Sequence, residues 1–138
     1  MQEHLSQRQA LDLIGELESA TKLLDLGIGE LHALGLASDF YDLPLQLLAQ
    51  GLERFLKVTY AMAELGRAGT LPSPAQMKRY GHDLQSLTDD LVQIVSTSKA
   101  CVRRPAVQED MSFVRSSTEL RAVLAHLGDF GKRNRYYR

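Results

Sequence analysis

The stretch LDLIGELESATKLLDLGIGEL, residues 11–31, decides the fold class of this chain. Its apolar residues recur at steps of four, three, four, four and three, which places them on one face of an α-helix. They are Leu13, Leu17, Ala20, Leu24, Ile28 and Leu31. The spacing predicts a helix over residues 3–34. Gly27 and Gly29 favour a bend or an early end in its last turns, because Gly costs about 1 kcal/mol relative to Ala inside a helix.

Helical patterning continues outward from this stretch, and no segment alternates apolar and polar residues as a half-buried strand does. Leucine supplies 24 residues, against ten for valine and isoleucine together. We expect further helices over residues 43–66, 74–101 and 106–114, and a last one that begins at a capping box of Ser116 and Glu119. Short loops between four main helices predict an all-α, up-and-down bundle in one domain.

Composition limits the classes of protein that this chain can represent. Its 138 residues are 44% apolar and 24% charged, which is typical of one folded domain, residues 1–138. A net charge of -1 argues against binding to nucleic acid or to a membrane by electrostatic attraction alone. No apolar run reaches membrane-spanning length, and the N-terminus lacks a signal-peptide layout. The single cysteine, Cys101, favours a reducing compartment, so we expect a cytoplasmic protein.

Charge is uneven along the chain. Residues 1–30 sum to -4, whereas residues 103–138 sum to +4. The last seven residues hold four cations and two aromatics, a mixture that binds phosphates and stacks on unpaired bases. A solvated helix end, with cations at the negative pole of the helix dipole, is the alternative. The candidate binding residues are Arg133, Asn134, Arg135, Tyr136, Tyr137 and Arg138.

The end of the chain carries two further expectations. The apolar spacing of the last helix projects onto Asn134, so we expect its amide to face inward. The helical pattern still runs at Arg138 without a C-cap glycine, which favours a chain that continues beyond it.

His82 and Asp83 form a second candidate site, at the start of the third helix. A carboxylate there can cap backbone amides or orient the imidazole ring. The segment is similar to the acceptor segment of histidine phosphotransfer domains, but it departs from them at Gln85 and Ser86. No Glu-x-x-His pair, glycine-rich phosphate loop or paired Cys/His spacing is present, so no metal and no cofactor are predicted.

Three fragments resemble HEPN domains: GLERFLK at 51–57, YGHDL at 80–84 and DFGKRN at 129–134. The resemblance implies a small homodimeric helical bundle that binds RNA or a partner protein, or a metal-independent RNA endonuclease of a toxin or defence system. Arg133 and Asn134 look like the start of the nuclease motif, but position 138, where a histidine would follow, is Arg. We therefore expect a non-catalytic module that binds through its basic C-terminal helix end. The alternatives are the ribonuclease, histidine phosphotransfer and a purely structural bundle.

Overall fold

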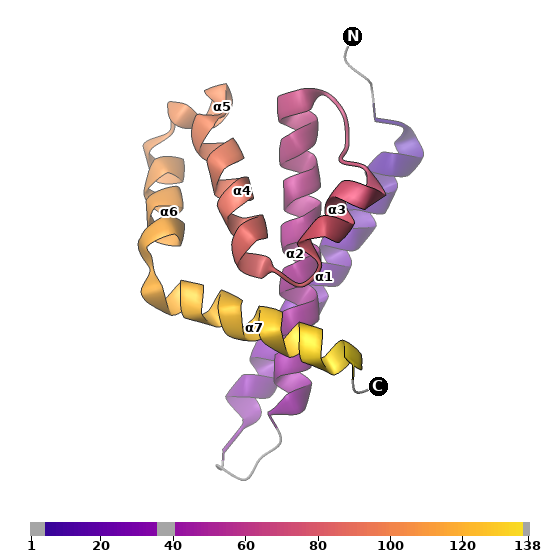
Figure 1. Cartoon of the computed structure of the whole chain (residues 1–138), viewed down its shortest axis with the longest axis vertical. Helices are drawn as coiled ribbons and strands as arrows, with labels where there is room; N and C mark the ends of the chain where they lie inside the picture. The colour runs from indigo at the N-terminus through magenta and orange to yellow at the C-terminus, as the bar shows by residue number, and fades with distance from the viewer. Residues whose placement is uncertain (1–4, 36–40, 137–138) are drawn as a thin grey trace.

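The computed structural model describes residues 5–35 and 41–136, with side chains as far as Arg133 in the last helix. These residues form seven α-helices and no strand, so the all-α prediction is confirmed, and the helices pack as a bundle (Figure 1). The helices are α1 Gln7–Ala33, α2 Asp42–Ala68, α3 Pro74–Tyr80, α4 Leu84–Thr97, α5 Lys99–Val102, α6 Pro105–Ser116 and α7 Thr118–Tyr136. No helix in this part of the chain is long and apolar enough to cross a membrane.

Helix α1 begins at a capping box in which the Ser6 hydroxyl accepts from the Gln9 amide and the Gln9 side chain accepts from the Ser6 amide. It continues through Gly27 and Gly29 to Ala33, so the glycines do not end it early. Gly27 serves packing instead, because a Cβ there would lie 2.8 Å from Cγ of Leu48 in α2. Gly51 of α2 has the same role toward α1. Small residues thus let α1 and α2 approach closely as an antiparallel pair (Figure 1).

The expected single helix over residues 74–101 is wrong, because the chain turns sharply after Tyr80. Gly81 has a positive φ of 53°, a conformation that disfavours a side chain. Asp83 then caps a new helix, α4. A further break at Ser98 separates α4 from α5. The consequence is a tight turn, residues 81–83, that the sequence pattern placed inside a helix.

The start of the last helix also differs from the prediction by one residue. Ser116 is the final residue of α6, and its hydroxyl donates to the Ser112 carbonyl. The hydroxyl of Ser117 instead accepts from the Leu120 amide, 3.2 Å away, and so caps α7. The predicted short helix near 106–114 is present as α6, slightly longer at both ends.

The hydrophobic core lies where α2, α4 and α7 meet. Its buried residues are Ala49, Leu56, Leu84, Leu87, Leu91, Leu124 and Leu127. Helix α7 runs across α2 and α4 and does not continue the antiparallel row (Figure 1). Where α7 crosses α4, it also passes over the 81–83 turn. The contact between α7 and this turn positions the candidate site.

Candidate functional site

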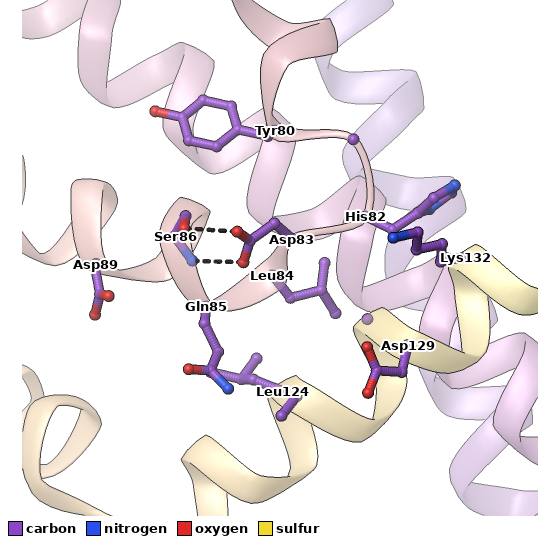
Figure 2. Close-up of a pocket in the computed structure, with 13 residues that line it drawn as sticks. Tyr80, His82, Asp83, Leu84, Gln85, Ser86, Asp89, Leu124, Asp129 and Lys132 are labelled. Carbon is purple, nitrogen blue, oxygen red and sulfur yellow. Dashed lines mark hydrogen bonds between the residues drawn. The ribbon is translucent and has the colours of Figure 1, made fainter.

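A hollow of about 680 Å³ lies between the α3–α4 turn and α7. We call it the α4–α7 groove; it is lined by residues 80–86 and Asp89 on one side, and by Leu124, Ala125, Gly128, Asp129 and Lys132 on the other. Figure 2 shows Asp83 and Gln85 on one side and Asp129 on the other, with the Asp83 carboxylate directed toward Ser86. The volume lies within the range of pockets that hold small ligands or anchor side chains of a partner.

Two glycines allow α7 to approach the turn so closely. A Cβ on Gly128 would lie 2.6 Å from the carbonyl oxygen of His82, which is closer than real Cβ atoms come. A Cβ on Gly131 would lie 3.4 Å from Nδ1 of His82. Glycines three positions apart share one face of a helix, so both face the turn. The sequence analysis missed them, although this Gly-x-x-Gly spacing inside an amphipathic helix was the available signal.

His82 belongs to a half-buried polar cluster that reaches α2. Its Nδ1 lies 2.8 Å from Oε2 of Glu53, and the other oxygen of that carboxylate accepts a hydrogen bond of 2.7 Å from Lys57. Nε2 of His82 is buried and has no hydrogen-bond partner among the described residues. In Figure 2 the imidazole points away from the carboxylate of Asp83 and from the centre of the groove. The predicted His82–Asp83 pair is therefore split, and the carboxylate that holds His82 is Glu53, which sequence reasoning did not single out.

Asp83 has the capping role that was one of its two predicted roles. Its carboxylate accepts hydrogen bonds from the Ser86 amide at 3.1 Å and from the Ser86 hydroxyl at 2.7 Å (Figure 2). The bond from the Ser86 amide is the main reason that the pKa of Asp83 lies below its usual value. Asp83 therefore stays ionised at the mouth of the groove.

Tyr80 closes the end of the groove next to α3. Its ring packs edge-on against Tyr60 of α2, with ring centroids 5.2 Å apart, and its hydroxyl donates to Asp90. Burial, followed by the hydrogen bond to Asp90, raises the pKa of the Tyr80 phenol well above its ordinary value. The phenol therefore stays protonated, as a fixed donor held by its own chain.

The remaining charged groups of the groove differ in whether they already have partners. Asp89 forms an ion pair with Arg121 of α7. In contrast, Asp129 and Lys132 make no ion pair or side-chain hydrogen bond with any described residue. Both are exposed. As far as the described side chains go, the groove thus presents one unpaired carboxylate and one unpaired ammonium from the same face of α7.

The predicted basic end lies just beyond this pair. Arg133 is exposed on α7, next to Lys132. Asn134, Arg135 and Tyr136 continue the helix, but their side chains lie outside the described part of the chain, as do Tyr137 and Arg138 altogether. The expectation that Asn134 faces inward, and the roles given to the last four residues, stay predictions.

The site combines an imidazole held by a carboxylate with charged groups that line the groove. An imidazole oriented by a carboxylate is a common element of acid–base sites, and here its second nitrogen is buried without a hydrogen-bond partner among the described residues. The groups that do face the groove are a capping carboxylate, a paired carboxylate, and the free Asp129 and Lys132. No family model, curated protein or solved structure matches this chain.

Proposed function

We propose that this chain is a non-catalytic, HEPN-like binding module, homodimeric and cytoplasmic, that engages a partner protein through the α4–α7 groove and the adjoining basic end of α7. The single observation that carries the proposal is the free pair of Asp129 and Lys132 in a hollow of about 680 Å³. A partner segment can place a cationic side chain against Asp129 and an acidic group against Lys132 and Arg133. Both contacts are charge-assisted hydrogen bonds of the stronger kind.

The charges of the groove favour a protein over RNA as the partner. A phosphate chain that follows the groove toward Lys132 passes Asp83, which is ionised, and Asp129, which forms no ion pair with a described residue. Repulsion between carboxylates and phosphates disfavours that path. A polypeptide offers charges of both signs at close spacing, and the groove has both signs.

A binding titration tests the proposal with defined probes. Fluorescence anisotropy compares labelled peptides that carry an arginine and a glutamate with single-stranded RNA of the same length. We expect the peptides to bind and Asp129→Asn to weaken their binding about tenfold, a typical loss for a charged hydrogen bond. Asp110→Asn is the matched control, because Asp110 is an exposed carboxylate on α6, outside the groove. Binding of RNA that Asp129→Asn strengthens, with no binding of peptide, would overturn the proposal.

A metal-independent ribonuclease is the second candidate, and the hydrogen bond between His82 and Glu53 is the observation that favours it. Such an activity requires the ring to turn so that Nε2 reaches the groove. Incubation of RNA with the protein in chelator decides between the two. The binding proposal expects intact RNA, whereas cleavage that disappears in His82→Asn would establish the ribonuclease.

A further inference from the structure

Helix α1 carries a row of β-branched residues that α2 leaves uncovered. Ile14, Thr21 and Ile28 follow one another at intervals of seven. Ile14 is 54% exposed, Ile28 is 47% exposed, and Thr21 is exposed as well. A spacing of seven keeps residues on nearly the same side of a helix, so the three form one stripe.

A second row of leucines runs beside this stripe. Leu17, Leu24 and Leu31 each follow a member of the first row by three positions, and each is half-buried. Together the two rows form a complete heptad pattern, with β-branched residues at the first position and leucine at the fourth. We call this set the heptad seam; its members are Ile14, Leu17, Thr21, Leu24, Ile28 and Leu31.

The packing of α1 leaves the β-branched row of the seam exposed, while the leucine row is half-buried. Among the described residues, α1 makes extensive contact with α2 only. That contact is centred on Ala20 and Gly27, the only residues that α1 buries fully. These two residues lie on the side of the leucine row away from the β-branched row. Within residues 5–35 and 41–136, therefore, no neighbour removes the β-branched row from water.

We propose that α1 pairs in parallel, through the heptad seam, with α1 of a second copy of this chain. The proposal rests on the two-copy state proposed above and adds the surface where the copies meet. β-Branched residues at the first heptad position with leucine at the fourth favour parallel two-stranded coiled coils. The seam has this arrangement in every heptad except that threonine replaces isoleucine in the middle one.

The carboxylates that flank the seam select the parallel orientation. Glu18 and Asp25 each follow a β-branched residue by four positions. In a parallel pair Glu18 and Asp25 of the two copies lie on opposite sides of the interface and do not face one another. In an antiparallel pair Glu18 of one copy faces Asp25 of the other, and two such contacts repel. Charge therefore argues for the parallel dimer.

Thr21 fits this role because its hydroxyl is already satisfied. Oγ1 of Thr21 donates to the Leu17 carbonyl at 2.9 Å within α1. Covering Thr21 with a second helix therefore leaves no orphaned donor, which would cost free energy in a dry interface. A lone polar residue in a heptad seam also fixes the register of the two helices, since threonine meets threonine in only one alignment.

Sedimentation equilibrium of the full chain tests the proposal. We expect a dimer for the native protein and at least a hundredfold weaker association for Ile14→Glu combined with Ile28→Glu, because each change puts a carboxylate into the apolar seam. The matched control is Leu26→Glu combined with Ala33→Glu. Leu26 and Ala33 are exposed, lie on the same helix seven positions apart and point away from the seam. We expect this control to stay dimeric. A monomeric native protein, or equal dissociation of both variants, would overturn the proposal.

Disulfide trapping tests the orientation without placing a charge in the seam. In a Cys101→Ser background, Ile14→Cys faces its own copy only in the parallel dimer, so we expect a cross-linked dimer on mild oxidation. Absence of that product, while the native chain is dimeric, would refute the parallel seam. Peptide titration of the groove then separates the two proposals. If the protein is a monomer that binds the peptide, only the dimer proposal is overturned. If the disulfide-linked dimer forms but does not bind the peptide, only the proposal for the α4–α7 groove is overturned.

Discussion

Helices α1 and α4 show how little helix length says about burial. Helix α1 has 27 residues and buries two, Ala20 and Gly27, both of them small. Helix α4 has 14 residues and buries five, among them Leu84, Leu87 and Leu91. The difference arises because α4 lies against α2, α6 and α7, whereas α1 lies along α2. Helix α4 is therefore covered on several sides, whereas no other described helix packs extensively on the outer face of α1.

The largest predicted effect separates these two helices. Leu87 is 1% exposed, so Leu87→Ala should lower the free energy of unfolding by about 2–5 kcal/mol through lost burial and a cavity. Leu11→Ala, on the outer side of α1, should change it by less than about 0.5 kcal/mol. Urea unfolding followed by circular dichroism measures both. Equal losses would contradict the contrast between the two helices.

The next effect concerns the crossing of α7 over the 81–83 turn. Gly128→Ala brings a Cβ to 2.6 Å from the carbonyl oxygen of His82, which is backbone and cannot move aside easily. We expect a loss of about 1–3 kcal/mol in stability, typical of overpacking. Amide shifts in NMR spectra should change at residues 81–84 as α7 moves away. An unchanged unfolding midpoint would mean that the close approach is not required.

The two helix starts give a smaller contrast. Asp83→Ala removes the cap of α4 and should cost about 1 kcal/mol, whereas Ser6→Ala should cost less, because the first turn of α1 can fray without opening the core. Thermal unfolding of the two variants measures this order. A larger loss of stability in Ser6→Ala than in Asp83→Ala would contradict this order and show that the first turn of α1 unfolds together with the core.

The Asp83 cap also has a predicted pH dependence. Folding lowers the pKa of Asp83, so its ionised carboxylate stabilises the folded state. This stabilisation is fully present above the unfolded pKa of 3.8 and is lost as the pH falls through the lower native pKa. Asp83→Ala should therefore differ from the native protein most at neutral pH and least in acid. A difference that stays constant down to the acid limit would contradict this origin.

The smallest effect should be stabilising and lies in α1. A Cβ on Gly15 meets nothing within 4 Å. Gly15→Ala should therefore raise stability by about 0.5–1 kcal/mol through helix propensity alone. We expect the melting temperature to rise in Gly15→Ala and to fall in Gly128→Ala, although the chemical change is the same. A destabilised Gly15→Ala variant would mean that another surface covers this part of α1.

The sequence was enough to predict the helices but not the groove. Apolar spacing predicted α1 and α2 to within a few residues, because each helix has a continuous apolar face, and the short helix expected near 106–114 is present as α6. Apolar spacing predicted α3, α4 and α5 as one helix. A glycine such as Gly81 can occur inside a helix, and its positive φ, which ends α3, is not evident from the sequence.

The site depends on residues far apart in the chain. Glu53 and His82 are 29 positions apart, and no local spacing predicts their contact. The approach of Gly128 to His82 depends on the direction in which α7 crosses the bundle, which apolar periodicity does not specify. The basic residues near the C-terminus were the strongest sequence signal, and of them Lys132 lines the groove and Arg133 is exposed beside it.

Hydrogen–deuterium exchange at a series of protein concentrations tests most directly whether α1 is completed by a second copy. We predict that amide protection across residues 14–31 rises with concentration, while protection across residues 84–97 in α4 stays constant. Protection of α1 that does not change with concentration would contradict the account, since its uncovered face would then be a feature of the isolated chain.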